Sequence, residues 1–310
     1  MKNEKDYSGS FEINPILQKM RTNPVANNGV GKYFTTRSGD KLYYRVWKSD
    51  SQNKIVVGIH GMAAHSEYYI QVADQLIDKS ISVYALDLKQ HGHSVGKKGD
   101  LKSFKEIIEH VDQFIDNIIK TNKDTPIYLM GISMGGVIAI NYSVEIQDKD
   151  DDKIKGMILM APGVKTKLKL SFTDILKLPF YVLVYLVKSD KLIINIVERS
   201  AVGSRNPLRL DYQNEDELRI QKVSLRYLLG LNSYKKVALK NAKNIIHPVI
   251  IFQGTEDNLV SYEGVKAFFE EIPIEDKTFI ELDGAYHSLY SDPAMIEKGY
   301  EKLRNWLLKH

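Results

Sequence analysis

The feature that most constrains this chain is a G-x-S-x-G pattern, Gly131-Ile132-Ser133-Met134-Gly135. An apolar run at residues 127–130 reads as a strand before it, and residues 137–142 read as the start of a helix after it. A sharp strand-to-helix turn holds a serine exposed and points the helix N-terminus at a developing negative charge. The pattern alone occurs by accident in roughly one chain in ten of this length. The flanking strand and helix therefore carry the prediction that Ser133 is a nucleophile.

Two later strand ends supply the base and the acid that a nucleophilic serine requires. Residues 248–254 read as a buried strand followed by Glu256 and Asp257, and residues 277–282 read as a strand followed by His287. Side chains at the carboxyl ends of parallel strands meet at one edge of the sheet. The chain order of serine, acid and histidine is that of a Ser-His-Asp triad on a parallel sheet. The pattern leaves two neighbouring carboxylates as candidates for the acid.

An oxyanion hole requires two backbone N–H donors beside the nucleophile. The Met134 amide, directly after the serine, is the first candidate. The second should come from the loop after an early strand. Residues 54–59 read as that strand and His60-Gly61-Met62 opens the loop, so we predict the Met62 amide as the second donor.

These motifs resemble those of the α/β-hydrolases of the monoacylglycerol lipase and bacterial lysophospholipase group, also described as serine aminopeptidase-like. Residues 60–69 are similar to that group's H-G-M-A-E-H-S-x-R-Y loop, with Ala64 for Glu and Tyr68 for Arg. Residues 87–99 are similar to D-x-R-G-H-G-x-S-x-G-x-R-G, with Lys for both Arg and Gln90 for Gly. The turn that carries the serine, residues 131–136, is similar to that group's G-H-S-M-G-G, with Ile132 for His.

The acid and base loops extend the resemblance towards the C-terminus. Residues 254–260 are similar to G-x-x-D-x-x-V, and residues 283–287 to D-G-A-x-H. The resemblance places the acid three residues after Gly254, which favours Asp257 over Glu256. It begins near Lys41, is weakest at residues 163–231, and spares all three triad positions.

The fold expected is an α/β-hydrolase, because βα units repeat along the chain and imply a mostly parallel central sheet flanked by helices. More chain separates the strands near Met160 and Val249 than one crossover needs. We therefore predict a core at residues 1–163 and 232–310, and an inserted, mainly helical cap at residues 164–231. The resemblance implies cleavage of carboxylic esters of a single acyl chain through an acyl-enzyme, without metal or cofactor.

The sequence is compatible with two other functions. An aminopeptidase or amidase could use the same three residues, but it would need an anchor for a substrate ammonium, which the sequence does not identify. A non-catalytic lipid-binding protein on this fold would usually have lost a triad member, and none is missing.

The predicted cap contains ten consecutive uncharged residues, 178–187, after lysines at 165, 167 and 169. One interpretation is an inner cap helix packed on the core. The other is an exposed lipid-entry surface whose lysines lie near anionic headgroups, which would give peripheral membrane contact through the cap. From this segment we expect Tyr181, Val184 and Leu186 to line the substrate pocket.

Composition excludes several other classes. The net charge of +4 is small and spread among acids, so nucleic-acid binding is not expected. The chain has no cysteine, which excludes disulfides and a thiol nucleophile and suits a reducing compartment. No secretory signal or membrane span is recognised, so we expect a cytoplasmic protein, peripheral at a membrane surface if the cap binds lipid. The sequence leaves the oligomeric state open.

The remaining histidines and acids favour structural roles. We expect His60 and His65 to order their loop through hydrogen bonds to backbone. His91 and His93 form a lone H-x-H, which is insufficient for a metal site. The acidic run at 148–152 is expected to be a solvated loop, since no EF-hand glycine and glutamate follow.

Overall fold

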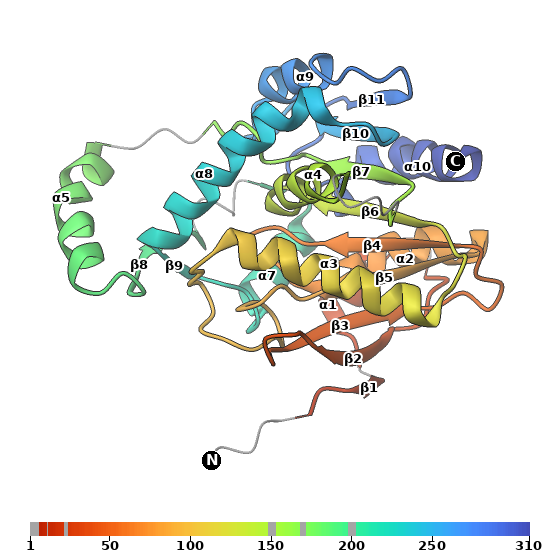
Figure 1. Ribbon diagram of the computed structural model, residues 1–310, viewed down its shortest axis with the longest axis horizontal. Coiled ribbons are helices and arrows are strands. Elements are labelled where there is room, and N and C mark those ends of the chain that lie inside the picture. The colour runs from red at the N-terminus through yellow and green to blue at the C-terminus, as the bar shows by residue number, and fades with distance from the viewer. Residues whose placement is uncertain (1–5, 11, 22–23, 148–152, 168–171, 198–202) are drawn as a thin grey trace.

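The structure, a computed structural model, describes residues 6–10, 12–21, 24–147, 153–167, 172–197 and 203–310 (Figure 1). Its strands are β1 (Gly9–Ser10), β2 (Val30–Thr35), β3 (Lys41–Trp47), β4 (Lys54–Ile59), β5 (Ile81–Leu86), β6 (Ile127–Ile132), β7 (Gly156–Met160), β8 (Leu192–Asn195), β9 (Lys222–Ser224), β10 (Val249–Gly254) and β11 (Lys277–Leu282). Its α-helices are α1 (Pro15–Met20), α2 (Ile70–Leu76), α3 (Phe104–Thr121), α4 (Met134–Gln147), α5 (Phe172–Val187), α7 (Pro207–Glu215), α8 (Leu225–Asn241), α9 (Tyr262–Glu270) and α10 (Tyr300–Lys309).

In the described residues one sheet of nine strands has the order β1-β2-β3-β5-β4-β6-β7-β10-β11. From β5 to β11 every neighbouring pair is parallel, whereas β1, β2 and β3 pair antiparallel. The expected mostly parallel α/β sheet is confirmed. The strands β4, β6, β10 and β11 therefore end at one edge, and the loops that carry the site residues leave from there.

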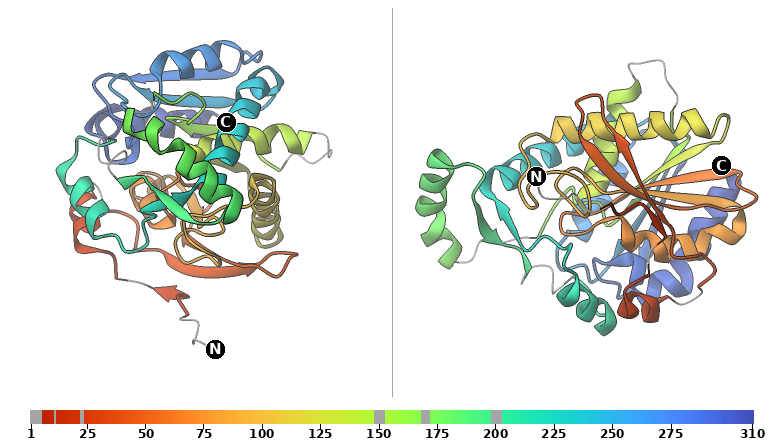
Figure 2. Two further views of the ribbon diagram at one scale, coloured as in Figure 1. Left: turned by 90° about the vertical axis from the view of Figure 1, so that its left-hand side faces the viewer. Right: turned by 90° about the horizontal axis from the view of Figure 1, so that it is seen from below.

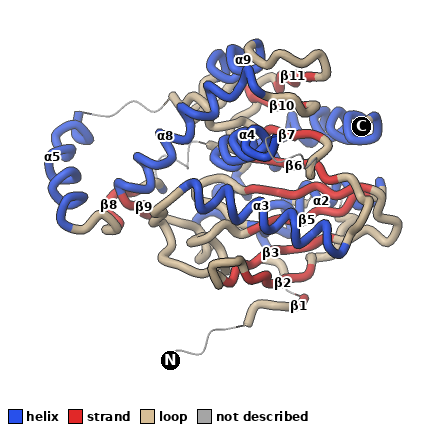
Figure 3. The backbone as a smooth tube through the Cα atoms, viewed as in Figure 1, coloured by secondary structure: helices blue, strands red, loops and turns tan. Residues whose placement is uncertain are grey.

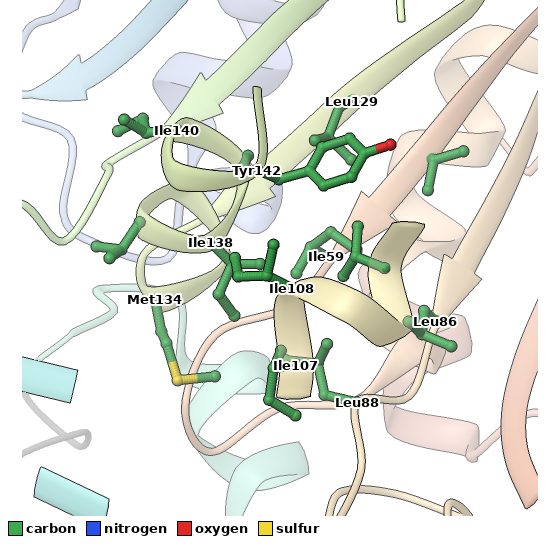
Figure 4. Packing of buried hydrophobic residues seen from close by; sticks show 14 of the residues in the cluster. Ile59, Leu86, Leu88, Ile107, Ile108, Leu129, Met134, Ile138, Ile140 and Tyr142 are labelled. Atoms are coloured by element: carbon green, nitrogen blue, oxygen red, sulfur yellow. The ribbon is translucent and has the colours of Figure 1, made fainter. Parts of the chain in front are cut away.

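Helices cover both faces of this sheet (Figures 1 and 3). Buried side chains of α3, α4, α8 and α9 share one hydrophobic cluster, and those of α1, α2 and α10 share the other. Figure 4 shows the first cluster, where Ile138 of α4 and Ile108 of α3 pack near Ile59 of β4. Ser103 caps α3 by accepting a hydrogen bond from the Glu106 amide.

The segment between β7 and α8 has the helices α5 and α7 as its longest elements, in agreement with the mainly helical cap that the sequence predicts. Besides α5 and α7 it contains the antiparallel pair β8 and β9, whose strands are too short to give a clear pattern. The predicted boundary at residue 231 lies inside α8, which continues from the cap into the core. Two helices are preceded by turns of other helical types: a 3₁₀ turn at Ser66–Tyr69 precedes α2, and a π-helical turn at Met295–Gly299 precedes α10.

The helix α5 stands at the outer end of the cap, beyond β8 and β9, in Figure 1 and in the right view of Figure 2. Most of its described apolar side chains are exposed, including Phe180 at 57% and Leu183 at 61%. The interpretation of this stretch as an inner helix packed on the core is therefore wrong. Apolar periodicity alone does not distinguish a helix face that meets protein from one that meets another surface.

Candidate active site

Ser133 lies in a strained turn between β6 and α4. Its backbone has a φ of 56°, and its amide donates to the Met160 carbonyl at 3.0 Å. The turn requires glycine on both sides: a Cβ at Gly131 would lie 2.4 Å from the Gly135 oxygen, and one at Gly135 would lie 2.0 Å from the Ile59 oxygen. The half-buried hydroxyl is thereby held at the carboxyl edge of the sheet.

The three predicted side chains meet in one line of hydrogen bonds. His287 Nε2 lies 2.9 Å from Ser133 Oγ, and His287 Nδ1 lies 2.8 Å from Asp257 Oδ2. An ionised carboxylate only accepts, so Nδ1 carries the proton and Nε2 is left to accept the serine hydroxyl. This is the tautomer that a histidine base requires.

Asp257 is fully buried, and its carboxylate accepts several hydrogen bonds. Its Oδ1 accepts from the Leu259 and Val260 amides, both at 2.8 Å, and Gln253 Nε2 donates to Oδ2 at 3.2 Å. Burial raises the pKa of the carboxyl, but His287 and the two amides outweigh it, so the pKa of Asp257 lies below its ordinary value. Asp257 thus remains a charged acceptor. Glu256 is exposed, and Asp257, not Glu256, is the carboxylate bonded to His287 Nδ1.

The predicted oxyanion donors flank the serine. Met134 is the first residue of α4, and Met62 lines the same cavity as Ser133. A Cβ at Gly61 would lie 3.5 Å from Ser133 Cβ, so the two loops approach closely. Within the described residues, neither the Met62 nor the Met134 amide donates to another protein group. Both amides are therefore available to a ligand oxygen.

The two loop histidines, His60 and His65, have different hydrogen-bond partners. His60 accepts from the Leu88 amide through Nε2 and donates from Nδ1 to the Gly61 carbonyl, as expected. Burial, with help from His91, lowers its pKa to about 3, so it is neutral. His65 instead pairs through Nε2 with Asp216 of the cap at 3.0 Å. The backbone partner expected for His65 is thus wrong, because sequence does not show which cap side chain folds over the loop.

A cavity of about 120 Å³ opens beside the triad. Tyr181, Val184 and Leu186 do not line it, because α5 lies at the outer end of the cap, with Leu186 74% exposed. The polar wall of the cavity includes Arg209, Gln213 and Arg219, which were not singled out from the sequence. The residues that line the cavity are Gly61, Met62, Ala63, Ala64, Tyr68, Ile132, Ser133, Gly203, Arg209, Gln213, Arg219, Leu259, His287, Ser288 and Tyr290.

The start of the cap is joined to the loop that carries the acid. Thr166 forms an antiparallel bridge with Val260, and the Ser261 amide donates to the Lys165 carbonyl at 2.8 Å. The Lys167 ammonium donates to the Asp257 carbonyl at 2.7 Å. The first residues of the cap therefore help to hold the Asp257 backbone.

Among the described residues, one group has the spacing of a cation site, namely Asp40, Glu106 and His110. The Lys89 ammonium already lies among them, at 2.7 Å from Asp40 Oδ2 and 2.8 Å from Glu106 Oε1. A lysine in this position supplies the positive charge, so these residues form an ion-pair network and not a metal centre. The His91 ring nitrogens also lie against protein groups, with Nδ1 3.0 Å from the Lys89 carbonyl oxygen and Nε2 3.1 Å from the Met62 carbonyl oxygen.

A parallel sheet of this order, with serine, acid and histidine on loops at its carboxyl edge, defines an α/β-hydrolase. The family model described as "Serine aminopeptidase, S33" matches residues 50–294. The chain therefore belongs to the serine aminopeptidase S33 family, as its motifs predict.

Similar proteins cover nearly the whole chain. The monoglyceride lipase of Homo sapiens is 29% identical over 286 residues, which is 89% of each protein. Phospholipase YtpA of Bacillus subtilis is 26% identical over 250 residues, 80% of this chain and 92% of that one. The crystal structure of Paleococcus ferrophilus monoacylglycerol lipase is 28% identical, with a TM-score of 0.74 and coverage of 87% and 99%.

Proposed function

We propose that this protein, a carboxylic ester hydrolase, cleaves esters of a single acyl chain through Ser133, His287 and Asp257. The observation that carries the proposal is the continuous line of hydrogen bonds from Ser133 Oγ through His287 to Asp257, at the wall of a cavity. The similar proteins named monoglyceride lipase and phospholipase support a lipid ester as the substrate.

The proposed reaction is a two-step acyl transfer. Ser133 Oγ attacks the ester carbonyl while His287 Nε2 takes its proton, and the Met62 and Met134 amides hold the oxyanion. The protonated His287 then gives its proton to the departing alcohol. Water repeats the sequence on the acyl-enzyme and releases the acid. Asp257 keeps the imidazole in the required tautomer and stabilises its cation.

The cavity argues against the amidase alternative. A substrate ammonium needs a carboxylate or another acceptor-rich wall, yet the residues that line the cavity include two arginines and neither Asp nor Glu. Cationic walls repel an ammonium in a low-dielectric site.

A hydrolysis panel tests the substrate class. We expect turnover of monoacylglycerols, lysophospholipids and short p-nitrophenyl esters, and no turnover of aminoacyl amides. Triacylglycerol should be a poor substrate, because the cavity beside the triad is small. A purified enzyme that cleaves only the amides would contradict the proposal.

We also propose that α5 is the surface through which the protein meets lipid. Leu176, Phe180, Leu183 and Val187 recur at helical spacing and are 64%, 57%, 61% and 82% exposed. The exposed lysines at 177, 188 and 191 flank this apolar face. An apolar face bordered by lysines is typical of a helix that lies in the interface of an anionic membrane. In the described residues, no helix has the length and hydrophobicity to cross a bilayer.

Changing Leu183 and Leu186 together to Asp should weaken binding to vesicles of phosphatidylcholine and phosphatidylglycerol at least roughly 10-fold, because each leucine contributes about 1.5–3 kcal/mol when buried in lipid. Co-sedimentation measures the binding. Leu308→Asp on α10, where the leucine is 55% exposed, is the matched control and should bind normally. Equal binding by the α5 variant and the wild type would exclude α5 as the lipid surface.

A further inference from the structure

The cavity beside the triad contains a buried cation with unused hydrogen-bond donors. Arg209 of α7 is 3% exposed and lines the cavity together with Ser133 and His287. Its Nη2 donates to the Tyr290 hydroxyl at 2.6 Å, while its Nε and Nη1 are buried without a hydrogen-bond partner. The guanidinium also lies over the Tyr68 ring, 3.9 Å from the centroid. A buried donor without a hydrogen bond costs free energy of folding, so an acceptor for these two N–H groups would be favourable.

The carboxylates that bond to the tyrosines around this cation are committed to other partners. Asp216 Oδ2 accepts from the Tyr68 hydroxyl at 2.7 Å and from His65 at 3.0 Å, and its Oδ1 accepts from the Leu218 amide. Glu67 accepts from the Tyr212 hydroxyl at 3.0 Å. In the described residues no ion pair joins Arg209 to a carboxylate. Its positive charge is thus supported mainly by the faces of two tyrosines.

A second buried cation lies on the wall of the same cavity. Arg219 is 7% exposed, lines the same cavity, and donates through Nη1 to the Gln213 carbonyl at 2.8 Å. Burial lowers the pKa of the Arg219 guanidinium, and the charge of Arg209 acts in the same direction. The residues that line the cavity include these two arginines and neither Asp nor Glu, so no carboxylate of the lining compensates their charge.

From this arrangement we infer that the cavity binds an anionic group on the alcohol part of the ester, and that the preferred substrate is an acylated glycerol phosphate bearing a phosphate monoester. The inference rests on the proposed function, because it identifies the substrate of the same site. A planar guanidinium with two free N–H groups matches the oxygens of a phosphate. A choline headgroup would lack a site for its cation, since Arg209 already covers the faces of Tyr68 and Tyr290.

The chemistry of a lipid ester places the anion on its alcohol part. Arg209 lines the same cavity as Ser133 and His287. Because the acyl part of a single-chain lipid ester is hydrocarbon, an anionic group that meets Arg209 must belong to the alcohol, whose leaving oxygen receives the proton from His287. In the reaction, water adds across the acyl C–O bond, its hydroxyl goes to the acyl carbon, and its proton goes to the alcohol, which leaves as glycerol phosphate.

The test compares oleoylglycerol with oleoyl lysophosphatidate, two substrates that differ only in the phosphate. We expect the wild type to have the higher kcat/KM on lysophosphatidate. Arg209→Gln should lower the ratio of kcat/KM for lysophosphatidate to that for oleoylglycerol by roughly 10- to 100-fold, the range expected for a charged hydrogen bond. Arg205→Gln is the matched control, because Arg205 bonds Asp292 outside the cavity, and it should leave the ratio unchanged.

A second variant keeps the test independent of the folding of the first. Ala64→Glu places a carboxylate on the cavity wall and leaves Arg209 in place, so it should lower the same ratio. A wild-type preference for oleoylglycerol, or an equal fall in kcat/KM for both substrates in Arg209→Gln, would overturn the inference. In the second case Arg209 would only support the fold of the site.

Calorimetry with glycerol phosphate separates the inference from the proposed function. Binding to the wild type that is at least roughly 10-fold weaker in Arg209→Gln supports the anion site even if no ester in the panel is cleaved. Absence of binding to the wild type overturns the anion site, while turnover of oleoylglycerol would leave the esterase function standing.

Discussion

Ser133→Ala should lose ester hydrolysis by a factor on the order of 10⁴ or more while the protein remains folded, because the nucleophile is removed and only oxyanion and binding contributions remain. The structural reason is that Ser133 Oγ lies within hydrogen-bond distance of the base, at 2.9 Å from His287 Nε2. Steady-state turnover of a p-nitrophenyl ester measures the loss, and circular dichroism checks the fold.

Covalent labelling gives this prediction a second readout. A fluorophosphonate should label wild-type protein at Ser133 and should not label the alanine variant. Ser288→Ala removes another serine from the same cavity and should remain labelled. Persistent labelling of Ser133→Ala would show that a different residue is the nucleophile.

Asp257→Asn should lower kcat by several orders of magnitude, roughly 10⁴-fold, because an amide at this position stabilises the wrong imidazole tautomer. Asp257 Oδ2 is the partner of His287 Nδ1 at 2.8 Å, and its other oxygen is held by two backbone amides. Turnover of a short ester under saturating conditions measures the effect.

Glu256→Gln is the matched control, since it makes the equivalent change one residue away on an exposed side chain. Its turnover should remain within a few-fold of the wild type. A large loss in Glu256→Gln together with a silent Asp257→Asn would place the acid one residue earlier than the structure indicates.

The positions of the triad could be predicted from sequence because each lies at the end of a strand in a fixed topology. Ser133 follows β6, Asp257 follows β10 and His287 follows β11, and parallel pairing brings these ends to one edge. The glycine pattern around the serine adds a steric requirement that few sequences meet. The chemistry of the core is thus encoded within short segments.

The cap could be predicted much less well because its contacts join distant positions. His65 meets Asp216, 151 residues along the chain, and no local pattern links them. The apolar run at 178–187 looks the same whether it faces protein or lipid, so the orientation of α5 depended on the tertiary structure. Arg209 lies in no recognisable motif, so no local pattern of the sequence singles it out.

The connection between the cap and the acid loop limits how such a protein can be re-engineered. Because residues 165–167 supply hydrogen bonds to the loop at 257–261, excising the insertion at its first residue would unpair the segment that presents the Asp257 carboxylate to His287. Exchange of lids between relatives should therefore begin after residue 167. A chimera joined there inherits a new entrance and keeps its reaction centre.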